Sequence, residues 1–74
     1  MTDEQLIQIL EQTLGESAVG QIAMSTDLTN FPNFDSIAVI SIAAAIEVES
    51  GIEVFPDWLE EFTSPAAIKA VLAL

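Results

Sequence analysis

The apolar run from Ile37 to Ile46 restricts the fold more than any other feature of this sequence. It is too short to cross a bilayer, which takes about 20 mostly apolar residues, and Ser41 interrupts it. A run of this length predicts a buried helix. Asp35 and Ser36 precede the run and Gly51 follows it, so a helix should begin and end there, because short polar side chains cap helix starts and glycine favours helix ends.

The helix that we expect over residues 36–50 has apolar side chains at three- and four-residue steps. The side chains predicted to face the core are Ile37, Ile40, Ala43 or Ala44, and Ile46. Val39 and Ile42 lie beside this stripe.

The segment MTDEQLIQILEQTLG predicts the first helix of the chain. Thr2 and Gln5 have the spacing of a capping box, and Gly15 is a stop signal. The side chains on its inward face are Leu6, Ile9, Leu10, Thr13 and Leu14.

Two helices should follow residue 51. The segment IEVFPDWLEEF predicts an extended piece before Pro56 and then a short third helix. In TSPAAIKAVLAL, a cap at Thr63 or Ser64 and proline at the first helical position predict a fourth helix. Its apolar side chains are Ile68, Val71 and Leu72.

A long connection joins the first two helices. Residues 16–34 contain Gly20, the polar run STDLTN and Pro32, which together break regular structure. The apolar residues expected to hold this loop on the core are Val19, Ile22, Leu28 and Phe34. We therefore predict one all-α domain over residues 1–74, a four-helix bundle with a long first loop and a short third helix.

Charge and composition limit the partners. The sequence has twelve acidic residues and one basic residue, Lys69, so its net charge is −11. This charge repels nucleic acid and favours docking to basic protein surfaces. We also expect a monomer. The chain has no cysteine, and MTDEQ is not the start of a secretory signal, so we expect a cytoplasmic protein.

The residue types exclude most catalytic chemistry. The chain has no histidine, cysteine or tyrosine, and therefore lacks the usual general base and thiol nucleophile, so we do not expect an enzyme. Oxygen ligands occur together in DLTNFPNFD, but their spacing is not that of a calcium loop. Turn formation explains Asp27, Asn30, Asn33 and Asp35 better than metal binding does.

Ser36 has two interpretations. It can cap the helix, as Ser and Asp commonly do, or its hydroxyl can be the point at which another protein attaches a group. The amides and positive dipole end of a helix tolerate an attached phosphodiester anion. Asp35 could then orient the incoming donor and its metal ion.

Over nearly its whole length the sequence resembles the acyl carrier proteins. Leu28 late in the first loop and the tripeptide DSI at residues 35–37 match the family's pattern, as does the order of the segments AIEVESGIEV, FPDWLEEF and TSPAAIKAVL. The resemblance implies that Ser36 receives 4′-phosphopantetheine from coenzyme A through a magnesium-dependent phosphopantetheinyl transferase. Asp35 corresponds to the acid before that serine and would assist the modification.

The second helix departs from the family's pattern. Carriers of fatty acid synthesis have acids just after the serine, where this chain has Ala38, Ser41 and Ala44. That helix is the usual docking face, so the departure predicts a more apolar contact with a dedicated partner; alternatively, the alanines only allow close packing. Trp58 is unusual on the third helix and is either a packing anchor or a partner contact. The predicted docking residues are Ile37, Ala38, Val39, Ser41, Ile42, Glu47, Glu49 and Trp58.

The implied function is acyl carriage in a specialised fatty-acid or polyketide-type pathway, with acyl-loading and acyl-processing enzymes as partners. An aminoacyl or peptidyl carrier is an alternative, although such carriers commonly have glycine near the serine, where this chain has Phe34 and Asp35. An alternative of another class is an unmodified acidic helical adaptor that binds through its second helix.

Overall fold

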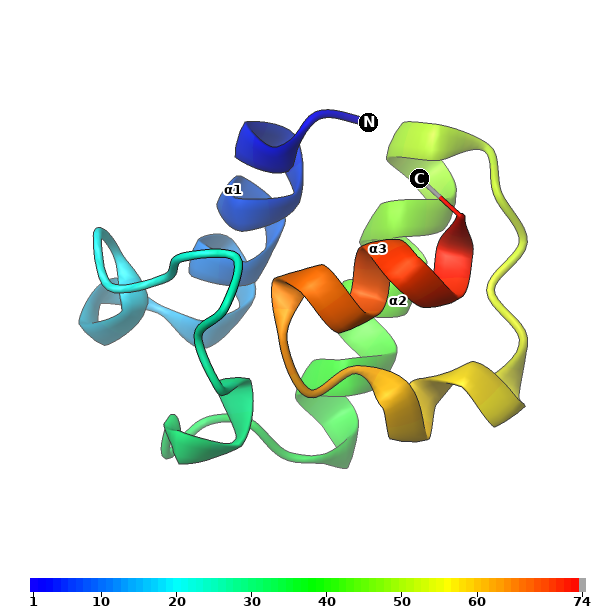
Figure 1. Ribbon diagram of the computed structural model, residues 1–74. Coiled ribbons are helices and arrows are strands. Elements are labelled where there is room, and N and C mark those ends of the chain that lie inside the picture. The colour runs from blue at the N-terminus through cyan, green and yellow to red at the C-terminus, as the bar shows by residue number, and fades with distance from the viewer. Residues whose placement is uncertain (74) are drawn as a thin grey trace.

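The computed structural model describes residues 1–73 and contains only helices and irregular segments over that range. Figure 1 shows α3 crossing in front of α2, with α1 on the other side of the bundle. The prediction of an all-α bundle with a long first loop is confirmed. In chain order the elements are α1 (Asp3–Leu14), the 3₁₀-helices η1 (Glu16–Ala18) and η2 (Leu28–Asn30), α2 (Ser36–Ser50), the 3₁₀-helix η3 (Pro56–Glu61) and α3 (Pro65–Leu72).

Helix α1 forms as its sequence predicts. The Thr2 hydroxyl accepts from the Gln5 amide at 3.1 Å and the Gln5 side chain accepts from the Thr2 amide at 2.8 Å, which completes a capping box. Gly15 ends the helix with a φ of +89°, a value that a residue with a Cβ adopts only with strain. The side chains that α1 buries are Leu6, Ile9, Leu10 and Leu14.

Helix α2 has the predicted bounds but not the predicted inward face. Ile37 and Ile40, both predicted to face the core, are 74% and 59% exposed. The residues that α2 buries are Ala38, Ile42, Ala43 and Ile46. The prediction was wrong for Ile37 and Ile40 because α2 is apolar on all sides, so the periodicity of its sequence does not select one face. Packing against α1 and η3 selects it instead.

The first loop is pinned to the start of α3. The Leu28 amide donates to the Thr63 carbonyl at 2.8 Å, and the Ala66 amide donates to the Met24 carbonyl at 2.9 Å. Leu28 is fully buried, as predicted. Val19 was expected in the core but is 59% exposed, at the position that ends η1.

The other loop residues agree with the prediction to different degrees. Ile22 is buried and Phe34 is half-buried against the core. These contacts hold the loop on the bundle, although it lacks long regular elements.

The third and fourth predicted helices correspond to η3 and α3. Gly51 ends α2 in the left-handed conformation, and residues 51–55 then run without regular structure to η3, as expected. Ser64 caps α3 by accepting from the Ala67 amide at 3.1 Å, and Ile68 and Leu72 are buried. Phe62, which the sequence pattern did not assign to the core, is one of the largest fully buried side chains.

No helix within residues 1–73 combines the length and hydropathy that a membrane span requires.

Candidate functional site

The candidate site is the first turn of α2. Asp35 is the N-cap residue, and its Oδ1 atom accepts from the Ala38 amide at 2.8 Å. Ser36 is the first residue of the helix and is exposed, and its hydroxyl makes no hydrogen bond to any residue of the described range 1–73. Asp35 therefore caps the helix, and the Ser36 hydroxyl remains available to solvent.

Three contacts hold the start of α2 in place. The Asn33 side chain donates to the Leu14 carbonyl at the end of α1, with an Nδ2–O distance of 3.0 Å. The Phe34 amide donates to the Phe31 carbonyl at 3.1 Å, and the Val39 amide donates to the Asp35 carbonyl at 3.0 Å. The long loop therefore delivers the exposed hydroxyl at a defined end of the bundle, beside the end of α1.

A groove between α2 and η3 opens at Ser36. Its first part has a volume of about 480 Å³ and is lined by Phe34, Asp35, Ser36, Val39, Ile40, Leu59 and Glu60. A second part of about 370 Å³ shares Ile40 and Leu59 with the first and is also lined by Ala43, Ala44, Glu47, Val54 and Pro56. The groove therefore follows α2 from Ser36 as far as Glu47, and it is mostly apolar with carboxylates at both ends.

The oxygen ligands of the first loop have structural roles. Asp27 Oδ1 accepts from the Thr29 hydroxyl at 2.5 Å and from the Thr29 amide at 3.0 Å, and these two bonds lower the pKa of the Asp27 carboxyl. Asn33 donates to the last carbonyl of α1, and Asp35 accepts from the Ala38 amide. Together with Asp27, three of the four candidate ligands therefore already make structural hydrogen bonds. In residues 1–73 no three His, Cys, Asp or Glu side chains gather as a metal site.

Two of the predicted docking residues lie in the core. Ala38 is 7% exposed and Ile42 is 0% exposed, so neither can form part of a docking patch. The correction follows from the register of α2, because Ala38 and Ile42 belong to its buried face together with Ala43 and Ile46. The other docking candidates that α2 contributes are either exposed (Ile37, Ser41, Glu47, Glu49) or half-buried (Val39).

The structure adds exposed apolar residues that the prediction did not include. Ile40 is 59% exposed and Val48 is 84% exposed, and Ala44 is also exposed. With Ile37 these residues recur at three- and four-residue steps, so they share one side of α2. We call Ile37, Ile40, Ala44 and Val48 the outer stripe. Its spacing is visible in the sequence, but nothing there shows that it faces solvent.

Trp58 packs partly against the core and partly against a neighbour. Its ring meets the ring of Phe55 edge to face, with the ring centroids 4.9 Å apart and an angle of 90° between the planes. Phe55 is itself 48% exposed, so this pair forms an aromatic corner beside the groove. A packing role for Trp58 is thus visible, and a partner contact stays a prediction.

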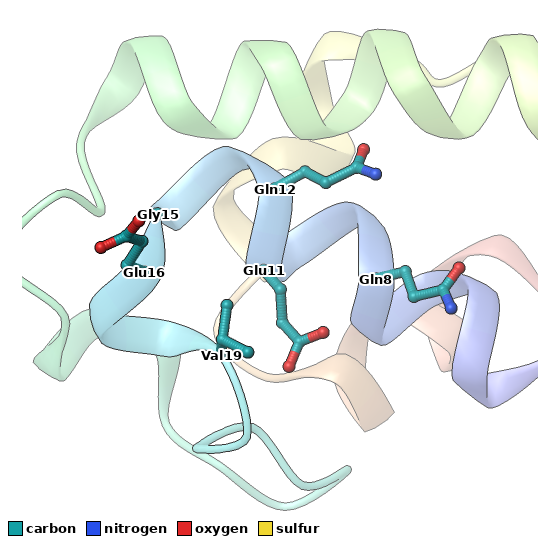
Figure 2. A pocket seen from close by; sticks show the side chains of 6 residues that line it. All are labelled: Gln8, Glu11, Gln12, Gly15, Glu16 and Val19. Carbon is teal, nitrogen blue, oxygen red and sulfur yellow. The ribbon is translucent and has the colours of Figure 1, made fainter.

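A second groove lies on α1 and η1. Figure 2 shows Glu11 and Val19 side by side on one side of the α1–η1 corner, with Gln8 farther along α1. Glu11 is already engaged, because its Oε2 atom accepts from the Gly20 amide at 2.7 Å. This groove of about 550 Å³ is lined by Gln8, Glu11, Gln12, Gly15, Glu16 and Val19, and none of these residues belongs to the candidate site.

The start of α2 thus presents an exposed serine hydroxyl beside an apolar groove of a small helical bundle. The family model for the phosphopantetheine attachment site matches residues 4–72, so the chain belongs to this family of carrier domains, to which 4′-phosphopantetheine is covalently attached. Comparisons with curated proteins and with solved structures give no match.

The residues at the start of α2 fit this group. A phosphodiester needs an accessible hydroxyl and an environment that tolerates an anion, and the N-terminus of a helix of 15 residues supplies such an environment. The groove beside Ser36 offers an apolar surface along which an attached chain can lie.

Proposed function

We propose that this chain is an acyl carrier protein whose Ser36 is the attachment point of 4′-phosphopantetheine. The observation that supports this most directly is the Ser36 hydroxyl, which is exposed and free of hydrogen bonds to residues 1–73 at the start of α2, within the range matched by the family model. Incubation with a broad-specificity phosphopantetheinyl transferase and coenzyme A tests the proposal, because intact-mass analysis should show the mass of one added arm.

The residues around Ser36 have separate roles in the modification. The Ser36 oxygen forms a new bond to the phosphorus that carries the pantetheine, while the bond from that phosphorus to the nucleotide part of coenzyme A breaks and the hydroxyl proton passes to the transferase. The positive end of α2 favours the phosphodiester that results. The loop contacts of Asn33 keep the hydroxyl at the surface, where the transferase can reach it.

The attached group supplies a thiol, which holds an acyl group as a thioester and which the cysteine-free chain lacks. The chain itself presents the arm and is recognised by partner enzymes, and carriers of this family are generally not catalytic.

Asp35 has two roles that substitution can separate. It caps α2, and we propose that it also assists the transferase reaction. Asp35→Ser keeps a capping oxygen, so stability should change by less than about 0.5 kcal/mol, whereas Asp35→Ala should cost about 1 kcal/mol. Both variants should load at least about ten-fold more slowly, which corresponds to the loss of one charge-assisted hydrogen bond. Thermal unfolding and time-resolved intact mass measure the two effects. If Asp35→Ser loads at the wild-type rate, Asp35 only caps the helix and does not assist the transferase.

We further propose that partners dock on the outer stripe, with Glu47 and Glu49 beside it. An interface of this composition has an apolar centre with charge at its rim, which fits partner enzymes with an apolar surface bordered by Lys and Arg. Ile37, Val39, Ser41 and Trp58 remain candidate contacts. Ile40 and Val48 take the place of the buried Ala38 and Ile42.

Loading kinetics at two ionic strengths test this docking surface. Raising the salt from about 0.05 M to 0.5 M should raise the KM of the transferase for this chain, because screening weakens attraction between exposed charges. Ile40→Glu should raise KM about ten-fold at both salt concentrations, since it removes apolar contact that screening does not affect. Ser25→Glu, which places the same charge on the exposed first loop, is the matched control. Equal KM values for both variants would contradict the proposed surface.

The pathway and the cargo belong to the same proposal. The apolar outer stripe differs from the acidic docking helix of general fatty-acid carriers, which favours a specialised fatty-acid or polyketide-type pathway with dedicated partners. An aminoacyl or peptidyl carrier would use the same arm, and the mass of the bound cargo distinguishes the two. A cytoplasmic location and a monomeric state stay predictions of the sequence.

The adaptor alternative makes a different prediction. An unmodified adaptor that binds through α2 would acquire no arm and would keep its function after any substitution of Ser36 that preserves the Asp35 cap. The mass measurement separates this class from both kinds of carrier.

A further inference from the structure

A thioester is an activated acyl group, and amines or thiols of the carrier itself can take the acyl group from it. This inference rests on the proposed function and concerns which side chains of the chain could do so. The sequence has no cysteine, histidine, tyrosine or arginine, and Lys69 is its only lysine. Serine and threonine hydroxyls are weak nucleophiles without an adjacent base, and the chain has no histidine to serve as that base.

Within residues 1–73, the groups that line the groove beside Ser36 cannot keep an acyl group. Phe34, Val39, Ile40 and Leu59 are hydrocarbon, and Ser36 itself is consumed by the arm. The remaining lining groups are the carboxylates of Asp35 and Glu60, whose attack on a thioester would form an anhydride, which is more reactive than the thioester itself. The second part of the groove adds only hydrocarbon side chains and the carboxylate of Glu47.

Lys69 lies at the other end of the bundle. Its ammonium group pairs with Asp3 at the start of α1, whereas Asn33, three residues before Ser36, contacts the end of α1 at Leu14. The eleven residue steps from Asp3 to Leu14 correspond to about 16 Å along a helix. Figure 1 shows the same separation, because the start of α1 lies near the end of α2 and far from its beginning.

We propose that the fold keeps its only lysine amine away from the arm and surrounds the arm's groove with unreactive side chains, so that thioester cargo is not lost to the carrier itself. The reaction that this arrangement avoids is transfer of the acyl group from sulfur to nitrogen. In that step the amine forms a C–N bond to the thioester carbonyl, the C–S bond breaks, and the sulfur takes up the proton that the nitrogen loses. The step needs no other reactant, but it requires a neutral amine close to the thioester.

A lysine placed in the groove should restore this reaction. In Glu60→Lys the new amine lies beside Ser36, where tethering gives it an effective concentration in the millimolar range or above. Glu4→Lys is the matched control, since it makes the same charge change on the exposed first turn of α1, at the end where Lys69 lies. Both variants and the wild type are loaded by the transferase with hexanoyl-coenzyme A and then incubated at pH 8.

Neutral hydroxylamine distinguishes the products, because it removes an acyl group from sulfur but not from nitrogen. Wild type and Glu4→Lys should lose the hexanoyl mass on this treatment. Glu60→Lys should retain it at least about ten-fold more, with the acyl group mapped to residue 60 by peptide mass analysis. Ala44→Lys, at an exposed position that lines the second part of the groove about 12 Å along α2 from Ser36, provides a second position if the transferase rejects Glu60→Lys.

The outcomes separate the two proposals. If wild type gains no hexanoyl arm, the proposed carrier function fails. If the variants load but Glu60→Lys and Ala44→Lys retain no more acyl group than Glu4→Lys, the carrier function stands and the protection proposed here is overturned. Equal retention by Glu4→Lys would also overturn it, since position within the fold would then not matter.

Discussion

Ser36→Ala is expected to abolish the mass gain that the wild-type chain shows with transferase and coenzyme A. The physical reason is that the modification requires an oxygen at position 36, and alanine supplies none. The loss should be complete rather than partial, because within residues 1–73 no other serine or threonine is exposed at the start of a long helix beside the groove. Intact-mass spectrometry under conditions that fully load the wild type measures it.

Two controls keep this result specific. Ser36→Ala should unfold at nearly the wild-type temperature, since Asp35 caps α2 and the Ser36 hydroxyl makes no hydrogen bond within residues 1–73. Ser25→Ala removes another exposed hydroxyl, on the first loop, and should load fully. A full mass gain in Ser36→Ala would refute the carrier proposal, and so would the absence of a mass gain in the wild type.

Ile42→Ala should destabilise the fold strongly, whereas Ile40→Ala should hardly affect it. Ile42 is fully buried in the core, and truncation of such a side chain typically costs about 2–5 kcal/mol because apolar contact is lost and a cavity remains. A domain of 74 residues has a total stability of roughly 4–11 kcal/mol, so the substitution removes a large part of it. Ile40 is 59% exposed, and its truncation should cost less than about 1 kcal/mol.

Denaturant unfolding of both variants measures the difference. The pair is matched in residue type, helix and substitution, so helix propensity affects both equally and the comparison reports burial alone. A larger loss for Ile40→Ala than for Ile42→Ala would mean that α2 faces the core in the register first predicted from its sequence rather than in the one observed.

Much of the fold follows from local signals. The capping box of Thr2 and Gln5, the glycines after α1 and α2, and Ser64 before Pro65 each act through a few neighbouring backbone groups. Their outcome therefore depends little on the rest of the chain, and the helix bounds came out close to the prediction.

The inward face of α2 did not follow from the sequence in this way. Its apolar residues lie on every side, and only Ala38, Ala43 and the two isoleucines at 42 and 46 meet the core. Phe62 was missed for a related reason, since it lies between two helices, where no periodicity marks it as buried.

Some features of the candidate site are likewise set by local sequence, and others depend on tertiary contacts. That Ser36 stands at the beginning of a helix is a local property, set by the order Asp-Ser before an apolar run, and the sequence alone determined it. That its hydroxyl is free, that a groove opens beside it and that Lys69 lies at the other end depend on contacts between residues far apart in the chain, such as Asn33 with Leu14 and Lys69 with Asp3. Tertiary structure decided these features because sequence periodicity describes one element at a time, whereas exposure depends on what the other elements cover.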